Sequence, residues 1–427
     1  MIASTVDDAL AQGERSGILK LSGYSLNKLD VLWIGKNSYK IDYSFDSNKL
    51  RWWECATYIK VDLSDNLLSQ LDDRISEWEY VKTIDLRKNA FTEFPSIISQ
   101  LPALTKLNIS KNQLERIVCD LINIVDLDAS LNRVIFFSAS IPNIHKLDLS
   151  HNKLTQVPVC LEECRYLASL NLAYNLISEC ENSLDGLKSL CDLDMSHNNL
   201  RKVFNKHTIL PNLVRLALNH NFLDQIPHGN FLKLTDLTLS YNQISHKDKI
   251  TESDGDILKS ALDLQVLDLC ENKLFMLPEG IFSLKSLKRL DFSNNSVRNL
   301  PPELGLLANL QTITYFGNPV KVPNGFGTEK LLKWLRNKLP LQDDEKDFKI
   351  HVQDVINVDL ENSKINMITR EMVQNMPKSL RLSGNLISYL DIIFGFGNNL
   401  SILELGRNRI KEFPIKSLPV LRVRIFW

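Results

Sequence analysis

The chain has 427 residues, of which 44% are hydrophobic, and a formal net charge of −1. This length supports a large core, and the charge lacks the basic excess with which nucleic-acid binders neutralise phosphates. The seven cysteines, at 55, 119, 160, 164, 180, 191 and 270, are odd in number and scattered, which predicts reduced thiols rather than a secreted disulfide framework.

The first 16 residues lack a basic start and an apolar segment, so we expect an N-terminal tail and no signal peptide. From residue 17 to 326 the sequence repeats the frame L-x-x-L-x-L-x-x-N-x-L, which is clear in LDLSHNKLTQVP at 147–158. The polar slot recurs mostly every 23 residues and is occupied by Asn66, Asn89, Asn112, Asn132, Asn152, Asn175, Asn198, Asn221, Asn242, Asn272, Asn295 and Asn318. Tyr24 occupies it in a weaker first unit.

This frame is that of a leucine-rich repeat. Each unit supplies one short strand whose leucines point inward, after which the chain must turn sharply. The turn leaves backbone groups inside the stack, and an asparagine amide offers two donors and an acceptor to satisfy them. We therefore expect the slot asparagines to be structural. The predicted fold class is an α/β leucine-rich repeat solenoid, a curved horseshoe with parallel strands on the concave face and short helical or irregular segments on the convex face.

Two departures from the regular repeat are visible in the array. The units around Asn132 and Asn152 have 20 residues, so we expect a tighter convex arc there. The step from Asn242 to Asn272 is 30 residues, and the charged segment 245–260 holds the surplus. We expect a tolerated surface insertion, with a regulatory loop as the alternative.

Residues 327–340 predict an amphipathic helix after the last full unit. Thr328 is a candidate N-cap, and Pro340 ends the helix. Leu331, Leu332, Leu335 and Leu339 share one face, and Lys330, Lys333, Arg336 and Lys338 lie on the other. A basic amphipathic helix can serve a membrane or a partner, but its position favours a cap on the exposed core.

An acidic linker, 341–349, precedes a second and incomplete array at 350–427. Its slots are Ser363, Asn385 and Asn408, and the next strand is expected near Val423 to Trp427, with Phe426 and Trp427 as a makeshift lid or the array cut short.

Two columns of residues predict a binding surface. The middle strand position is aspartate in seven of twelve units, which gives an acidic stripe, although solvated scaffolding explains it equally. The position before the slot carries rings in five successive units. Strand spacing of about 4.8 Å would align these rings over about 19 Å. The predicted docking centre comprises His151, Tyr174, His197, His220, Tyr241, Asp148, Asp194 and Arg215. The alternative is that these are frequent local choices at this position.

Motifs for catalysis are missing from the sequence. No phosphate-binding loop, nucleophile elbow, zinc-protease motif or dinucleotide fingerprint occurs. Cys160 with Cys164, and His197 with His220, lack further ligands, so we predict no metal and no cofactor.

The predicted function is a non-enzymatic intracellular scaffold that binds an unidentified protein, with signal transduction as one setting, and with no nucleic-acid partner and no membrane span. The alternative is a fragment of an extracellular or membrane-associated receptor, because Asn108, Asn294 and Asn399 are formal glycosylation acceptors.

The 23-residue pattern resembles the intracellular leucine-rich repeat proteins of the Ras-group and Scribble-like type. A narrower resemblance rests on RSGILKLSGYSL at 15–26, RWWE at 51–54 and GTEKLLKWLRNKLP at 327–340. It is to a group in which a first array, an internal helix and a second array follow one another. This resemblance implies a protein of the cytoplasm, with the nucleus as a second location, that binds other proteins and has no enzymatic activity.

Overall fold

The computed structural model describes residues 6–30, 58–180, 184–204, 208–245, 257–323, 326–339, 357–359, 379–387, 402–409 and 422–424. The chain forms two units, Met1–Leu341 and Gln342–Trp427. Each unit is built around its own parallel sheet.

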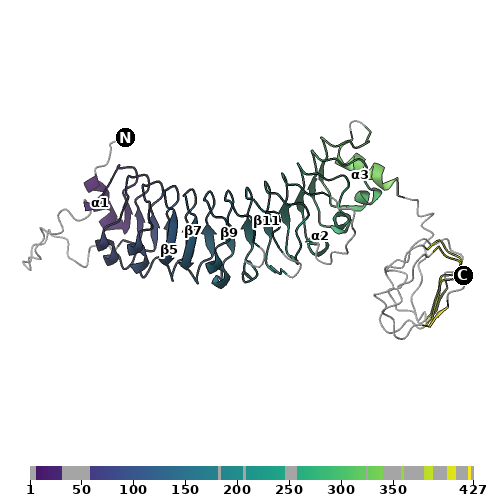
Figure 1. Ribbon diagram of the computed structural model, residues 1–427, viewed down its shortest axis with the longest axis horizontal. Coiled ribbons are helices and arrows are strands. Elements are labelled where there is room, and N and C mark those ends of the chain that lie inside the picture. Colours follow the sequence, from purple (N-terminus) through teal and green to yellow (C-terminus); the bar gives the residue numbers. More distant parts are fainter. Residues whose placement is uncertain are drawn as a thin grey trace, which may run out of the picture. The chain divides into compact units, whose positions relative to one another are not determined.

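The sheet of the first unit has 13 short strands within the described residues, all parallel and joined in chain order (Figure 1). Its strands are β1 (Ile18–Lys20), β2 (Lys60–Asp62), β3 (Thr83–Asp85), β4 (Lys106–Asn108), β6 (Asp126–Asp128), β8 (Lys146–Asp148), β9 (Ser169–Asn171), β10 (Asp192–Asp194), β11 (Arg215–Ala217), β12 (Asp236–Thr238), β13 (Val266–Asp268), β14 (Arg289–Asp291) and β15 (Thr312–Thr314). Equivalent positions of successive units face each other, as in the pairing of Asp192 with Arg215.

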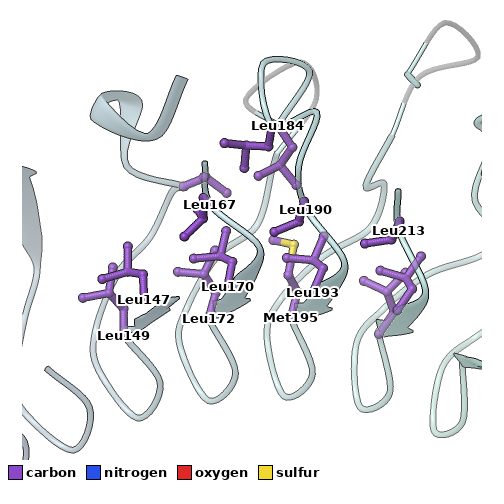
Figure 2. Close-up of a cluster of buried hydrophobic side chains, with 14 of the residues drawn as sticks. Leu147, Leu149, Leu167, Leu170, Leu172, Leu184, Leu190, Leu193, Met195 and Leu213 are labelled. Atoms are coloured by element: carbon purple, nitrogen blue, oxygen red, sulfur yellow. The ribbon is translucent and has the colours of Figure 1, made fainter. Parts of the chain in front are cut away.

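Each strand buries its central residue and leaves the two flanking residues on the open face. In β8, Leu147 is buried between the exposed Lys146 and the half-buried Asp148. Figure 2 shows the buried side chains of neighbouring coils stacked in rows, with Leu147 and Leu149 beside Leu170 and Leu172. Complete burial of one such leucine contributes roughly 1.5–3 kcal/mol. The stabilisation of the core is therefore the sum of the contributions from the stacked coils.

The slot asparagines close the turn after each strand. Asn198 donates from Nδ2 to the carbonyl oxygens of Leu172, Met195 and Ser196 at 2.9, 3.1 and 3.1 Å, and its Oδ1 accepts the Ile177 N–H at 3.0 Å. Two of these four partners belong to the preceding coil. Similar bonds recur at Asn66, Asn89, Asn112, Asn132, Asn152, Asn175, Asn221, Asn242, Asn272, Asn295, Asn318 and Asn408.

The residue before each slot has left-handed backbone geometry. The φ angle there lies between +52° and +57° at every non-glycine example, from Asp65 to Arg407. Such geometry costs an ordinary residue about 1–2 kcal/mol. It persists because the N–H of this residue donates to the next coil, as from His197 to the Asn219 carbonyl at 2.9 Å.

The side of each coil opposite the sheet strands carries short elements of varied type. They are the 3₁₀ helices η3 (Asp73–Glu77), η4 (Ser96–Gln100), η5 (Val159–Glu163), η6 (Glu279–Ser283) and η7 (Pro302–Leu306), and the helix α2 (Ile257–Ser260). Most of the 245–260 insertion precedes α2 and lies outside the described residues.

The two 20-residue units depart from this pattern in the way their length requires. In place of a helical turn they form the strands β5 (Arg116–Asp120) and β7 (Phe136–Ser140), which pair with each other in a separate parallel sheet. An extended residue advances about 3.3 Å against 2.0 Å in a 3₁₀ helix, so fewer residues cover the same path.

A helix lies against the first strand of this unit. The sequence predicts a tail at 1–16, but residues Val6–Ser16 form α1, which buries Ala9 and packs on β1 (Figure 1). The apolar residues Val6, Ala9 and Leu10 contact the core, and their three-to-four-residue spacing is the signal that could have identified the helix.

The helix α3 (Thr328–Arg336) lies against the last coil. Its Leu331, Leu332 and Leu335 are buried, as the amphipathic pattern indicates. The prediction that Thr328 caps the helix is wrong. Gly327 occupies the N-cap, so Thr328 is one position too late, and its Oγ1 instead accepts the Ile313 N–H at 3.3 Å.

The second unit has four parallel strands in its described residues. They are β16 (Asn357–Asp359), β17 (Ser379–Arg381), β18 (Ile402–Glu404) and β19 (Arg422–Arg424). Asn385 and Asn408 lie in its described turns, and each donates to a carbonyl three residues earlier. The last strand begins at Arg422, where the sequence predicted 423–427. Ser363, Pro340, Phe426, Trp427 and the linker after Leu339 lie outside the described residues.

Replacement of Asn198 by Ala should lower the free energy of unfolding by about 3–5 kcal/mol, because three buried carbonyls and one N–H lose their partner. The adjacent Asn199 is exposed and is the matched control, since Asn199→Ala should have little effect. Urea unfolding followed by circular dichroism measures both. Equal midpoints for the two variants would contradict the structural role of the ladder asparagine.

Replacement of Gly305 by Ala should separate α3 from the last coil. A Cβ at Gly305 would lie 2.7 Å from the Arg336 nitrogen and 2.9 Å from the Leu332 carbonyl oxygen, both in the α3 backbone. We expect a loss of about 2–3 kcal/mol and faster hydrogen exchange in 328–336. Leu306→Ala, a change at the exposed neighbour of Gly305, is the control. Unchanged exchange in the Gly305 variant would show that this contact does not hold the helix.

Candidate binding surface

The five rings before the slot asparagines share one backbone geometry and one register. Each residue is left-handed, with φ between +52° and +55°. Each also donates its N–H to the next coil, as from His151 to the Ala173 carbonyl at 2.8 Å and from Tyr174 to the Ser196 carbonyl at 2.9 Å. Identical geometry in successive coils gives every side chain the same direction, so rings at this position must meet face to face.

The structure brings these rings into one continuous stack. The ring centroids of His151 and Tyr174 are 4.1 Å apart, those of Tyr174 and His197 3.9 Å, those of His197 and His220 4.0 Å, and those of His220 and Tyr241 4.2 Å. The planes lie within 15° of parallel. We call this group, His151, Tyr174, His197, His220 and Tyr241, the ring ladder. It spans roughly 16 Å, less than the 19 Å expected, because the rings approach more closely than the roughly 4.8 Å between strands.

Stacking determines which part of each ring is available. The faces of the three inner rings are covered on both sides by their neighbours, so these rings offer edges to solvent. Tyr174 remains 45% exposed and Tyr241 48% exposed. The surface of the ring ladder is therefore a row of imidazole nitrogens, phenol hydroxyls and ring C–H edges, and it is fixed before any partner arrives.

The same column continues beyond the rings with other chemistry, which the sequence reasoning did not single out. Lys88 pairs with Asp65 at 2.9 Å near one end, and Asn294 donates to Glu271 at 2.7 Å near the other. Cross-coil contacts at this position are thus general along the array, and the rings are its aromatic segment.

The predicted aspartates have a local structural task. Asp194 Oδ1 accepts the Ser196 N–H at 2.9 Å, and Asp148 Oδ1 accepts the Ser150 N–H at 2.9 Å. Asn108 and Asn171 make the same bond in their units. This need for an acceptor explains why most units have Asp or Asn in the middle column, so part of the acidic stripe serves the turn rather than a partner.

Arg215 does not join Asp148 or Asp194. Its Nε lies 2.5 Å from Oδ1 of Asp192, the residue directly opposite it in β10. Both side chains are partly exposed, so the pair contributes less than about 1 kcal/mol. The sequence prediction counted carboxylates only at the middle strand position and cations at the first, so it missed Asp192, which shares the first position with Arg215.

Asp268, Cys270 and Asp291 are the one described group of three possible metal ligands, with atoms within 4.8 Å of one another. Both carboxylates already accept turn N–H groups, from Cys270 at 3.0 Å and from Ser293 at 2.9 Å. Burial, then nearby Asp268, raises the pKa of the Cys270 thiol to about 12, so the thiol stays protonated at neutral pH. We assign these contacts to the turn.

The family described as "Leucine rich repeat" matches residues 60–114, 138–200 and 263–320. These segments contain most of the strands and slot asparagines of the first unit, and the rings of His151, Tyr174 and His197. Over these segments the chain resembles leucine-rich repeat proteins. The predicted solenoid of parallel strands is confirmed, whereas the finer assignment to the Ras-group and Scribble-like type stays a prediction.

Similar proteins differ widely in setting. A leucine-rich repeat protein of Leptospira interrogans shares 22% identity over 98% of each chain, with a TM-score of 0.52. A chain from an octameric complex of Latrophilin 3, Unc5D and FLRT2 shares 23% identity over 60% of this chain and 83% of its own, with a TM-score of 0.51. Both likenesses show the fold alone.

A sequence relative is the leucine-rich repeat serine/threonine-protein kinase 1 of Caenorhabditis elegans, at 29% identity over 93 residues. The match spans 20% of this chain and only 4% of the kinase. None of the helices in the described ranges has the length and apolar character needed to cross a membrane.

His197 should protonate at lower pH than an ordinary histidine. Burial, and then the neighbouring His220, lower its pKa below 6.5, and Asp194 opposes the shift. Because the unfolded chain takes up this proton first, the stability contributed by neutral His197 is complete above about pH 6.5 and is lost as pH falls through its lowered pKa.

An NMR titration of the imidazole C–H resonances measures this value. His220→Tyr should raise the pKa of His197 and Asp194→Asn should lower it further. A His197 that titrates above 6.5 in the folded protein would contradict the geometry of the stack.

Proposed function

We propose that the protein is a non-enzymatic scaffold that binds a protein partner through the ring ladder and the strand residues beside it. The stacking of five rings from five coils is the observation that carries this proposal. Aromatic side chains supply large contact area with a polar tip and are enriched at the energetic centres of interfaces. The stack holds them in place, so little side-chain entropy is lost on binding.

The shape of the described surface supports a protein rather than a small molecule as the ligand. A hollow of about 220 Å³ lies between Phe204, Leu223 and Pro227, with Arg201 and Lys202 at its lining. Small-molecule sites are usually about 300–1,000 Å³. The ring ladder, in contrast, is an extended exposed row, which suits a partner that covers several coils.

We further propose an intracellular location and a signalling role. Support for the location comes from the cysteines. Six of the seven are described, and all six are free thiols. Burial, as the first cause, raises the pKa of Cys119 and of Cys164 to about 12. Inert, buried thiols fit a reducing compartment. The resemblance of 15–26, 51–54 and 327–340 to leucine-rich repeat-containing protein 40 supports the same location, and a two-array organisation with boundaries at 326, 340 and 349.

The leucine-rich repeat neighbours are compatible with a binding role. One comes from a complex described as containing Latrophilin 3, Unc5D and FLRT2. That assembly belongs to those proteins, and only the general idea of an exposed repeat surface that binds proteins is proposed for this chain.

Combined replacement of His197, His220 and Tyr241 by Ala should reduce capture of protein partners from a cell extract by at least about tenfold, because the centre of the interface is removed. Quantitative mass spectrometry of the captured proteins measures the loss. The left-handed backbone strain is not altered, since every residue except glycine bears it at this position.

The matched control is Asp65→Ala with Lys88→Ala and Lys111→Ala, three changes at the same turn position in other coils. This control should bind normally. The same partners captured in equal amounts by both triple variants and by the parent protein would refute the ring ladder as the docking centre.

A further inference from the structure

The strands beneath the ring ladder carry an excess of negative charge. On the exposed positions of β8–β13, Asp148, Asp192, Asp194, Asp236 and Asp268 stand against Lys146 and Arg215. In the turns, Glu271 follows the rings in the same column, and Lys153 and Lys273 lie at the two ends of the set. The four coils from Tyr174 to Tyr241 have no charged turn residue besides their histidines. Whereas the whole chain has a net charge of −1, the centre of this surface is clearly acidic.

Two of these carboxylates lack a compensating cation. Arg215 lies in register between Asp192 and Asp236 but pairs with Asp192. Within the described coils Asp236 has no ion pair, and its Oδ2 accepts only the Thr235 hydroxyl at 2.5 Å. Asp194 uses Oδ1 for Ser196 and likewise has no ion pair among these residues. Both side chains are half-buried, where a pairing charge interacts more strongly than in open water.

The protonation state of the ring-ladder histidines changes the net charge of this surface. A neutral imidazole edge offers a nitrogen acceptor, whereas a protonated one offers only donors and a positive charge. His151, His197 and His220 lie in one stack, His151 and His197 follow Asp148 and Asp194 closely in the chain, and their protonation would offset the acidic strands. Tyr174 and Tyr241 occupy the same column and carry a phenol in place of an imidazole.

We propose that the ring ladder and the strands beneath it bind a protein segment rich in lysine and arginine at neutral pH and release it on mild acidification. This inference rests on the proposed function and specifies the chemistry of the partner. Asp194 and Asp236 receive the cations of the segment, and the ring edges pack against the aliphatic stems of those side chains. Acidification adds positive charge to the stack, so the basic segment is repelled.

The close stacking of the rings couples the protonation of neighbouring histidines. His197 and His220 lie 4.0 Å apart, centroid to centroid, so a proton on one opposes a proton on the other. Burial and these neighbours hold the pKa of His197 below 6.5. His197 therefore keeps its neutral edge at neutral pH, and its charge appears only in acid.

Two synthetic peptides of equal length, one with lysine and one with glutamate at alternate positions, test the proposal against the immobilised full chain. At about pH 7.5 the lysine peptide should bind at least about tenfold more tightly than the glutamate peptide, and added salt should weaken it. Binding of the lysine peptide should fall by about fivefold to tenfold at about pH 5.5.

Charge variants locate the effect. Asp194→Asn with Asp236→Asn should weaken the lysine peptide by about fivefold to tenfold. The asparagine at 194 keeps the turn bond, as Asn108 and Asn171 do. The control is Asp62→Asn with Asp291→Asn, which removes the same charge from β2 and β14 and should leave binding nearly unchanged. Equal weakening by both pairs would overturn the proposal, because attraction would then be general to the array.

A titration variant isolates the histidines. His151→Tyr with His197→Tyr and His220→Tyr gives a stack of five tyrosines, each in a column that already holds Tyr174 and Tyr241. The ratio of lysine-peptide affinity at about pH 7.5 to that at about pH 5.5 should fall to about one in this variant, whatever its affinity at neutral pH. A retained loss of binding in acid would overturn the pH response of the ring ladder.

These outcomes are separable from those of the proposed function. If the alanine triple variant loses its captured proteins while the parent protein ignores the lysine peptide, the ring ladder binds proteins and the basic partner chemistry is wrong. If the lysine peptide binds but capture is unaffected by the alanine variant, the proposed function is wrong.

Discussion

The asparagine amide inside each turn is the interaction on which the first unit depends. It joins three carbonyls and one N–H, and two of these four groups belong to the preceding coil, as Asn198 shows. Each amide therefore fixes the turn in its own coil and the register with the coil before it. The leucines supply most of the stabilisation, but they are not directional, and the amides determine that every coil repeats the same path.

Repetition of the path has a consequence for the outer surface. Once the backbone of the turn is the same in successive coils, side chains at one position must be neighbours at one spacing. The ring ladder, the pair of Lys88 with Asp65 and the bond from Asn294 to Glu271 are three results of this rule. The proposed binding surface therefore does not need its own scaffold, because the core framework already aligns it.

Much of the fold and of the ring ladder could be predicted from the sequence, because residues one repeat apart in the chain lie side by side in neighbouring coils. The slot asparagines, the alignment of the five rings and the buried face of α3 follow from periodicity. The close stacking does not, since it depends on how the rings lean across the gap between coils. The ion pair of Arg215 with Asp192 rather than Asp194 depends on which residues face each other at the first position of neighbouring strands. The hydrogen bonds from turn N–H groups to the middle aspartates depend on backbone geometry that the sequence pattern does not contain. Thr328 failed as a cap because a shift of one residue at a helix end is below what propensity resolves.

At the left-handed turn position the backbone geometry belongs to the fold, whereas the side chain is free to vary and can determine which ligand binds. Glycine, asparagine, aspartate, lysine, leucine, histidine and tyrosine all occupy this position, with φ between +52° and +78°. A site that tolerates so many side chains leaves evolution free to rewrite an entire row without disturbing a single leucine or amide. One array can thus acquire an aromatic, ionic or polar face over a few coils while its interior stays the same, and new specificity would require only a handful of substitutions along one line.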